Sequence, residues 1–331
     1  MNAQVGVIGA GAWGTALAQS LASDGSEVLL WAREPGLAES INQDRRNQVY
    51  LPGTALSSGI TATSALSDLG ALPVLLAVVP AQFLASVLSQ LPAGARDLLL
   101  CAKGIEAGTG RLMAQVAADA APDARLAVLS GPTFAHEVAA GLPTAVTLAC
   151  SGGKEQWRQL APMIARPSLR PYYSDDVIGA EIGGAVKNVL AIACGVVDGL
   201  QLGQNARAAL IARGYAEMLR FGLARGARPE TLAGLCGIGD LVLTCSSTSS
   251  RNFSLGLALG QGQSMAEALA GKSSVAEGAA TAPVLADLAR QAGIQMPIVE
   301  AVRRLLDGES ASLVVAELLA RPLRAEQEHP V

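Results

Sequence analysis

Basic stretches and histidines are what this sequence has least of. The 331 residues carry a formal net charge of −4, and nowhere do lysines and arginines form a run. Without a positive surface to meet phosphate backbones, nucleic acid is excluded as an expected partner. Histidine occurs twice, and His329 falls in a polar C-terminal tail. A mechanism with a histidine base would depend on His136, which we interpret as an ordinary histidine of an early helical turn.

Cysteine pairs and targeting signals are missing as well. The five cysteines show no C-x-x-C spacing, and the N-terminus has no basic region followed by an apolar stretch and a cleavage site. We therefore expect a cytoplasmic protein whose cysteines are small buried hydrophobic residues, with neither a metal site nor disulfides.

Long uninterrupted apolar runs are also lacking. Mean hydropathy is +0.36, yet the most apolar stretch, Leu72 to Leu88, is interrupted by Pro73, Pro80, Gln82 and Ser86. The pattern favours a buried parallel strand, and no membrane span is expected.

What the first half does contain is an alternation of apolar runs with helical patterns. The runs expected to be strands are Val5–Ile8, Val28–Trp31, Val74–Val79, Leu98–Cys101, Leu126–Leu129 and Ala145–Ala149. Such alternation is typical of a parallel, doubly wound α/β sheet of the Rossmann type, in which ligands bind beyond the carboxyl ends of the strands.

The alternation stops after about Asp175, and only helical patterns follow. With 50% hydrophobic residues the chain has material for two cores. We expect a dinucleotide-binding domain over 1–178, an all-α domain over 179–324 and a tail over 325–331. Because the segment Ser174-Asp175-Asp176 has the residues of an N-cap that leads directly into the first long helix, the two domains should pack closely.

A glycine loop follows the first expected strand. Gly9, Gly11 and Gly14 have the spacing G-x-G-x-x-G, and a helical pattern begins at Thr15. The three glycines suit a tight turn, close approach of the backbone to a pyrophosphate, and packing of helix against strand. The helix N-terminus then directs free N–H groups at the phosphates, which predicts a dinucleotide cofactor.

The end of the second strand bears on which dinucleotide binds. A carboxylate there holds the ribose hydroxyls of NAD, whereas this chain has Arg33 followed by Glu34. The planar guanidinium of Arg33 suits a 2′-phosphate, so NADP is favoured and Glu34 keeps NAD open. Taken alone, Arg33 also fits a solvated surface charge.

The first long helix of the second half carries the chemistry we expect. Lys187 stands on a strip of small residues that includes Gly183, Gly184 and Gly195. We interpret the strip as a place where a cofactor ring and substrate approach the backbone. A lysine covered in this way loses solvation, its pKa falls, and it can exchange a proton with a substrate hydroxyl near neutral pH. The alternative is a lysine whose ammonium group reaches water at a packing edge.

Two further segments complete the expected site. Asp240, in the loop Gly237–Leu241, is placed to pair with Lys187 or to bind a substrate hydroxyl, or serves only as a helix cap. Ser250, Arg251 and Asn252 precede a helical pattern, and their side chains suit an anion at a helix N-terminus. A phosphorylated substrate is the expected occupant, with a simple Ser250 cap as the alternative.

Taken together, these motifs resemble the NAD(P)-dependent glycerol-3-phosphate dehydrogenase family over nearly the whole chain. The segments that carry the resemblance are Gly9–Gly14, Asn47–Gly53, Ala102–Gly104, Ser130–Ala135, Lys187–Asn188, Gly237–Leu241 and Ser250–Asn252. The resemblance implies reversible reduction of dihydroxyacetone phosphate to sn-glycerol 3-phosphate with NAD or NADP, for phospholipid synthesis in a bacterial cytoplasm.

The resemblance also implies roles for individual residues. Lys187 resembles the catalytic proton donor and acceptor, with Asp240 beside it. Residues that resemble substrate contacts are Lys103, Gly131, Thr133, Lys187, Asp240, Ser250, Arg251 and Asn252. Residues that resemble cofactor contacts are Gly9, Gly11, Trp13, Gly14, Arg33, Tyr50, Lys103, Ala135, Arg251, Val275 and Glu277. His136 matches no functional position.

Two other functions remain open from the residues. Another two-domain NADP-dependent dehydrogenase, acting on a hydroxy acid, shares the same halves, although the Lys187–Asn188 and Ser250–Asn252 segments argue against it. A sensor that binds NADPH without chemistry would not need Lys187 and Asp240. The expected partner is a phosphorylated small molecule, and the sequence allows a homodimer without requiring one.

Overall fold

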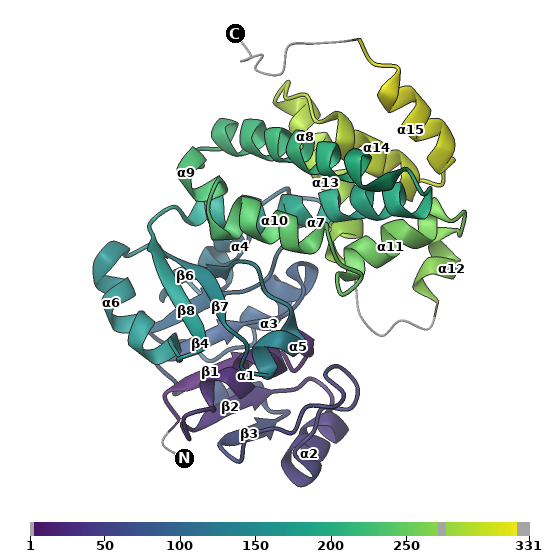
Figure 1. Ribbon diagram of the computed structural model, residues 1–331. Coiled ribbons are helices and arrows are strands. Elements are labelled where there is room, and N and C mark those ends of the chain that lie inside the picture. Colours follow the sequence, from purple (N-terminus) through teal and green to yellow (C-terminus); the bar gives the residue numbers. More distant parts are fainter. Residues whose placement is uncertain (1–2, 271–275, 323–331) are drawn as a thin grey trace.

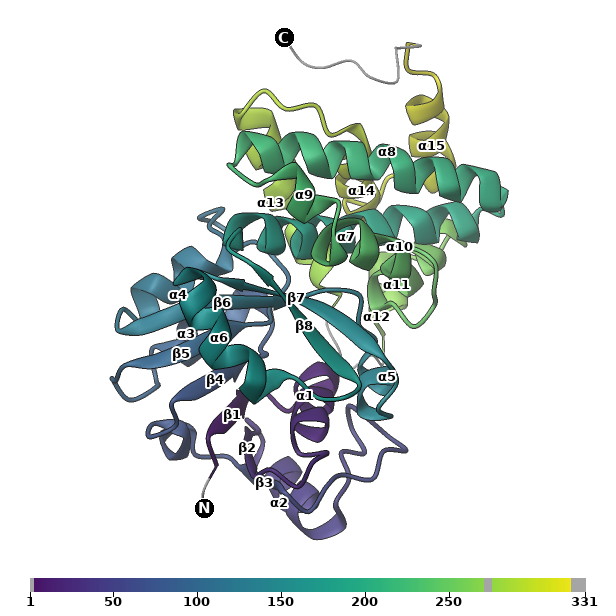
Figure 2. The same ribbon diagram turned by 60° about the vertical axis from the view of Figure 1, so that its left-hand side comes forward.

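The computed structural model describes residues 3–270 and 276–322, which form a sheet-containing part and a helical part (Figure 1, Figure 2). The expected tail, 325–331, and Val275 lie outside the described residues. The strands run in the order β3-β2-β1-β4-β5-β6-β7-β8. Their bounds are β1 Val5–Ile8, β2 Val28–Trp31, β3 Ile60–Thr63, β4 Val74–Ala77, β5 Arg96–Leu100, β6 Ala124–Ser130, β7 Thr144–Cys150 and β8 Leu169–Ser174.

The sheet confirms the expected Rossmann-type class. β1 pairs in parallel with both β2 and β4, so that Val5 faces Val28 on one side and Val74 on the other. The strand order reverses at this point, which is where ligands bind in open sheets of this kind. All four residues of β1 are buried, as are those of β2 and β4, because helices cover both faces.

Two groups of helices make those covers. The first six helices are α1 Ala12–Leu21, α2 Pro35–Asp44, α3 Leu84–Leu88, α4 Met113–Ala120, α5 Ala135–Ala139 and α6 Gly153–Ile164. Leu17 of α1, Ile41 of α2 and Leu160 of α6 share one hydrophobic cluster with the sheet. Leu84 of α3 and Val116 of α4 belong to a second cluster on the other side. Two short 3-10 turns, Leu66–Leu69 and Ala81–Phe83, follow β3 and β4.

The structure corrects the sequence prediction of the sheet in two respects. β3 and β8 were not expected, because both are edge strands with polar residues, and β8 contains Pro171. In addition, β7 is antiparallel to β6, with Ser130 facing Thr147, so the sheet is not wholly parallel. A buried antiparallel strand has the same apolar composition as a parallel one, so the residues of β7 do not reveal its direction.

The second part is helical, as expected. Its elements are α7 Val177–Gly199, α8 Gly203–Ala224, α9 Pro229–Leu232, a π-helical turn η3 Leu235–Gly239, α10 Asp240–Thr244, α11 Arg251–Gly260, α12 Met265–Leu269, α13 Glu277–Gln291, α14 Pro297–Leu306 and α15 Ala311–Leu319. The segment Gly237–Leu241, expected to be a loop, is therefore helical. The Asp176 side chain caps α7 by accepting from Gly179 N at 2.8 Å, which confirms the predicted N-cap.

Helix α7 is the centre of the helical part and contacts α8, α11, α13 and η3. Among the described helices, it is long and apolar enough to cross a membrane, but 89% of its most apolar window is buried inside the protein. Its apolar composition is therefore that of a core helix, because other helices surround it.

The strip of small residues on α7 receives protein rather than ligand, so its predicted occupant is wrong. A Cβ on Gly195 would lie 2.1 Å from Phe253 O, and one on Gly256 would lie 1.9 Å from Ile192 O. Glycine thus allows α7 and α11 to cross in backbone contact. Gly183 serves η3 in the same way, since its Cβ would lie 2.3 Å from Cys236 O. This close crossing places the N-terminus of α11 beside the middle of α7.

A buried carboxylate joins the two parts of the chain. Glu181 of α7 accepts from Ala114 N in the first turn of α4 at 2.7 Å. The N-cap position of α4 is Leu112, whose side chain has no acceptor, so Glu181 supplies the cap from another element. Burial raises the pKa of Glu181 from 4.5 to about 8, although the N–H groups of Ala114 and Met113 act to lower it.

We predict that Glu181 makes the stability of the protein fall as pH rises from about 5 to 8. Over this range the folded state holds a proton that the unfolded chain releases near pH 4.5, so the free energy of unfolding decreases by on the order of 3 kcal/mol. Glu181→Gln keeps an acceptor for Ala114 N and should remove this decrease, as measured by urea unfolding at several pH values. Glu39→Gln, on the exposed surface of α2, is the control. Parallel pH curves for the wild type and Glu181→Gln would contradict the prediction.

Candidate active site

The glycine loop has the geometry of a phosphate cradle. Gly9 adopts φ +113°, and a Cβ there would lie 2.7 Å from Val78 O. A Cβ on Gly14 would lie 1.8 Å from Gly9 O, which shows how tightly α1 begins against the loop. A Cβ on Gly11, in contrast, would meet nothing within 4 Å. The turn and the packing agree with the sequence prediction, and Gly11 faces open space.

The N-terminus of α1 offers donors to that space. Its N-cap is Gly11, which has no side chain to occupy the free N–H groups of the first turn. Trp13 Nε1 is buried and has no hydrogen-bond partner among the described residues. Unused donors at the positive end of a helix dipole fit the pyrophosphate of a dinucleotide.

The groups expected to choose between NAD and NADP lie together after β2. Arg33 Nη2 is 2.6 Å from Glu34 Oε1, and the Arg33 side chain is 72% exposed. Tyr50 lies near enough to interact electrostatically with Arg33. Both features that the sequence offered, a guanidinium and a carboxylate, are therefore present at one place.

Three charged side chains form the centre of the candidate active site. Lys187 Nζ on α7 and Lys103 Nζ, which follows β5, each lie 2.7 Å from an oxygen of Asp240, the first residue of α10. Lys103 also donates to Gly131 O at 3.1 Å. The Asp240 side chain is completely buried, and those of Lys187 and Lys103 are 8% and 13% exposed. The sequence prediction that Asp240 pairs with Lys187 is confirmed, and the alternative in which Lys187 reaches water is wrong.

Burial and charge shift the pKa values of this cluster. Burial lowers the pKa of Lys187 to about 8, helped by the positive charge of Lys103 and opposed by Asp240. For Asp240, burial acts to raise the pKa, but the two ammonium groups outweigh it and the pKa falls below the ordinary value. The site thus holds a stable carboxylate and an amine that can gain or lose a proton near neutral pH.

Thr244 belongs to this cluster and was missed by sequence reasoning. Its Oγ1 accepts from Lys187 Nζ at 2.9 Å and lies 3.2 Å from Asp240 Oδ1, to which it donates. Thr244 comes four residues after Asp240, which is one turn of a helix. The spacing of Asp240 and Thr244 predicts this contact only if a helix is assumed to begin at Asp240.

A chain of amide hydrogen bonds joins the lysines to the predicted anion site. Asn188 Nδ2 donates to Lys103 O at 3.0 Å, and Asn252 Nδ2 donates to Asn188 Oδ1 at 2.9 Å. Asn252 Oδ1 in turn accepts from Gly278 N at 2.9 Å. The N-terminus of α11 is therefore held next to Lys187 by side chains as well as by the glycine crossing.

The α11 N-terminus itself retains free donors. Ser250 is its N-cap and accepts from Phe253 N at 3.2 Å, so the cap that was the alternative to a phosphate site is present. The Ser250 hydroxyl proton can still donate to another group. Arg251 is exposed. Burial raises the pKa of Glu277, at the start of α13, while the charge of Arg251 opposes that rise, and Glu277 Oε1 accepts from Ala81 N at 3.2 Å.

Other predicted residues lie around this centre. Thr133 Oγ1 donates to Gly131 O at 3.3 Å, next to the Lys103 contact. Ala135 is the first residue of α5 and packs in one cluster with Trp13 and Leu51. His136 is exposed and stacks on Phe134, outside the charged cluster.

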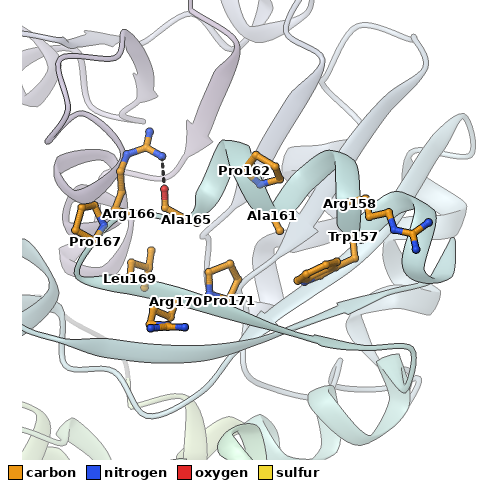
Figure 3. A pocket seen from close by; sticks show the side chains of 10 residues that line it. All are labelled: Trp157, Arg158, Ala161, Pro162, Ala165, Arg166, Pro167, Leu169, Arg170 and Pro171. Carbon is orange, nitrogen blue, oxygen red and sulfur yellow. Dashed lines mark hydrogen bonds between the residues drawn. The ribbon is translucent and has the colours of Figure 1, made fainter.

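A separate surface hollow does not include the predicted site. It has a volume of about 540 Å³ and lies between α6 and β8, with Trp157 and Pro171 among the residues that line it (Figure 3). Three arginines, Arg158, Arg166 and Arg170, also line it. None of the residues predicted to bind cofactor or substrate borders this hollow.

A glycine loop at the switch point of a doubly wound sheet, together with a helical domain that carries a buried lysine, is typical of a two-domain dinucleotide-dependent dehydrogenase. Comparison with known proteins specifies this class. The N-terminal profile of NAD-dependent glycerol-3-phosphate dehydrogenase matches residues 4–156, and the C-terminal profile matches 176–316. The chain therefore belongs to the NAD-dependent glycerol-3-phosphate dehydrogenase family.

Individual relatives agree with this assignment. Glycerol-3-phosphate dehydrogenase [NAD(P)+] of Erythrobacter litoralis is 69% identical over 99% of both chains. The protein of the same name from Novosphingobium aromaticivorans is 71% identical over 98% of this chain and 99% of its own. The crystal structure of glycerol-3-phosphate dehydrogenase from Coxiella burnetii superposes with a TM-score of 0.91 at 39% identity, covering 96% of this chain and 98% of that one.

We predict that Asp240→Asn destabilises the protein by about 3 kcal/mol at pH 7, because two buried ammonium groups would lose their common counter-charge. The loss should shrink as pH rises toward 10, because Lys187, whose pKa burial lowers to about 8, then loses its charge. Guanidinium unfolding at both pH values measures it. Asp287→Asn, which breaks an exposed pair with Arg290, should change stability by at most about 1 kcal/mol. Equal losses for the two variants would show that the buried cluster is not held by this charge.

Proposed function

We propose that this chain reduces dihydroxyacetone phosphate reversibly to sn-glycerol 3-phosphate with Lys187 as the proton donor and acceptor. The activity is that of its family, an NAD(P)-dependent oxidoreductase whose product serves phospholipid synthesis. The observation that carries the assignment of Lys187 is its burial beside Asp240, which keeps an amine of lowered pKa at a fixed place.

The side chains of the cluster have distinct roles in this proposal. A bound reduced nicotinamide supplies the hydride. Lys187, protonated at neutral pH, donates its proton to the carbonyl oxygen of the substrate as negative charge grows there. In the opposite direction the neutral amine accepts the proton of the alcohol. A pKa of about 8 suits both directions, since neither form of Lys187 is rare near neutral pH.

Asp240 and Lys103 prepare that proton transfer. Asp240 orients Lys187 through Oδ1 and Lys103 through Oδ2, so one carboxylate places both ammonium groups. We propose that Lys103 contacts both substrate and cofactor, because it is the more exposed of the two lysines and lies beyond the carboxyl end of β5. Its charge also favours an oxygen that becomes negative during the reaction.

We propose that the substrate phosphate binds at the N-terminus of α11. Arg251 supplies a guanidinium, Ser250 a hydroxyl proton and Asn252 its second amide N–H, next to the helix dipole. Gly131 and Thr133 follow β6, where Gly131 O accepts from Lys103 Nζ. Anchoring the phosphate holds the reacting carbon beside Lys187, which uses remote binding energy to orient the substrate.

The cofactor contacts remain those that the family resemblance implies. The cradle of Gly9, Gly11 and Gly14 fits the pyrophosphate, and Arg33 with Tyr50 lies toward the adenosine end. Arg251 and Glu277 would complete the site on the side of the helical part, and Ala135, at the start of α5, on the side of the sheet. We further propose the cytoplasm as the location, a division of the chain near residue 178, and a homodimer as an assembly to be tested by sedimentation.

We predict that Lys187→Met lowers kcat by at least a hundredfold, because positioned proton transfer contributes a factor of roughly 10² to 10⁴. NADH and NADPH should still bind, as measured by calorimetry, because the glycine loop belongs to the β1–α1 segment and Lys187 to α7. Loss of both turnover and cofactor binding by a folded variant would contradict the role.

Dihydroxyacetone phosphate should be reduced by the wild type in preference to 6-phosphogluconate or ketopantoate, the substrates of the rival dehydrogenases.

We predict that Arg251→Ala raises KM for dihydroxyacetone phosphate by about 10- to 100-fold, the effect of losing a charge-assisted hydrogen bond. The change in kcat should be smaller. Arg290→Ala removes an arginine of similar exposure from α13 and should leave KM unchanged. Initial rates of NADPH oxidation measure both variants, and an unchanged KM for Arg251→Ala would remove the phosphate role.

A further inference from the structure

Asn47 touches two segments that are far apart in the sequence and are both expected to bind cofactor. Its side chain is completely buried. Nδ2 donates to Ala10 O and to Thr15 Oγ1, each at 2.8 Å. Oδ1 accepts from Tyr50 N at 3.0 Å. One amide thus joins the glycine loop, the first turn of α1 and the segment that carries Tyr50.

The bond to Ala10 O determines which way the next N–H points. In a trans peptide the carbonyl and the N–H point in opposite directions. Asn47 and Thr15 hold Ala10 O toward the protein interior, at 2.8 and 3.3 Å. The Gly11 N–H is therefore turned away from them, on a residue whose Cβ position is open space. Within residues 3–270 and 276–322, no acceptor for this N–H is found.

The glycine loop needs such a constraint. Rotation of the peptide between Ala10 and Gly11 changes ψ of Ala10 and φ of Gly11. Glycine populates positive and negative φ about equally, so Gly11 does not resist this rotation. Gly9 already adopts φ +113°. Without a partner for Ala10 O, the peptide can rotate at little expense, and the Gly11 N–H would no longer stay aligned. Asn47 and Thr15 are the described side chains that bind this carbonyl.

The other end of Asn47 holds the Tyr50 segment in register with α1. Besides the bond to Tyr50 N, the main chain of Asn47 accepts from Leu51 N at 3.0 Å. Leu51 packs with Ala16 of α1 and with Val138 of α5. The turn from Asn47 to Leu51 is consequently tied to the same helix whose N-terminus forms the phosphate cradle.

We propose that Asn47 is a positioning residue for the dinucleotide: it fixes the Ala10–Gly11 peptide so that the Gly11 N–H faces the pyrophosphate, and it keeps Tyr50 aligned with that loop. The inference deepens the proposed function and depends on it, because the ligand is the nicotinamide dinucleotide of that reaction. Asn47 touches no ligand itself in this account and acts through the backbone of Gly11.

The test compares Asn47→Asp with a matched change at Asn42. Aspartate keeps the shape and the acceptor of Asn47 but loses both N–H donors. Asn42 makes an equivalent pair of bonds, to Ala62 O at 2.9 Å and from Ala62 N at 2.8 Å, and joins α2 to β3 without touching the loop. Asn42→Asp therefore reproduces the chemical change where no phosphate donor depends on it.

Calorimetric binding of NADH, NADPH and ADP-ribose is the main measurement. We expect Asn47→Asp to raise all three Kd values about tenfold, because all three ligands carry the pyrophosphate. At saturating cofactor, kcat and KM for dihydroxyacetone phosphate should stay within twofold of the wild type. Asn42→Asp should leave all three Kd values within twofold. Thermal unfolding shows whether Asn47→Asp folds. If it does not, the same measurements are made on Asn47→Leu, which adds no charge, and on Thr15→Val.

The possible results distinguish the role of Asn47 from the proposed function. Dinucleotide binding within twofold of wild type in a folded Asn47 variant would overturn the inference, and so would equal losses for Asn47→Asp and Asn42→Asp. A raised Kd for NADH with an unchanged Kd for ADP-ribose would overturn the inference too. If the wild type binds ADP-ribose but does not reduce dihydroxyacetone phosphate, the proposed function fails, whereas the ratio of Kd values between the two variants still decides the role of Asn47.

Discussion

The contact between Asp240 and two lysines is the interaction on which the rest of the structure depends. A carboxylate without solvent exposure is stable only when charge and hydrogen bonds replace water, and here Lys103 and Lys187 do so at 2.7 Å each. Lys103 belongs to the sheet-containing part, whereas Lys187 and Asp240 belong to the helical part. The same three groups that would carry the chemistry therefore also join the two halves of the chain.

Several features of the helical part serve to keep that cluster in place. Glycines at Gly195 and Gly256 allow α7 and α11 to meet backbone to backbone, and Gly183 admits the π-helical turn that leads to Asp240. The amides of Asn188 and Asn252 then continue the connection from Lys103 to the N-terminus of α11, where we propose that the substrate phosphate binds. Close packing of small residues thus holds three charged groups and two amides, from the segment after β5 and from α7, α10 and α11, within hydrogen-bond distance of one another.

Much of the fold could be predicted because its signals are local. Six apolar runs indicated six strands, and the polar segment Ser174-Asp175-Asp176 indicated the start of α7. The edge strands β3 and β8 escaped prediction because exposed strands lack continuous apolar runs, and the direction of β7 escaped it because direction leaves no mark on composition. The Lys187–Asp240 pair was predicted, whereas Thr244 and the Asn188–Asn252 bond were not, since they depend on a short helix and on two helices meeting.

The sequence by itself determined the class of the protein: a glycine loop between strand and helix, and motifs whose order matches a dehydrogenase family. These are properties of neighbouring residues, which backbone geometry and periodicity already restrict. Only the tertiary structure decided which side chains contact one another. It showed that protein fills the small-residue strip of α7, that one carboxylate holds two ammonium groups, and that Asn47 lies against Ala10 O. Contacts between residues dozens of positions apart arise from packing, which no local pattern encodes.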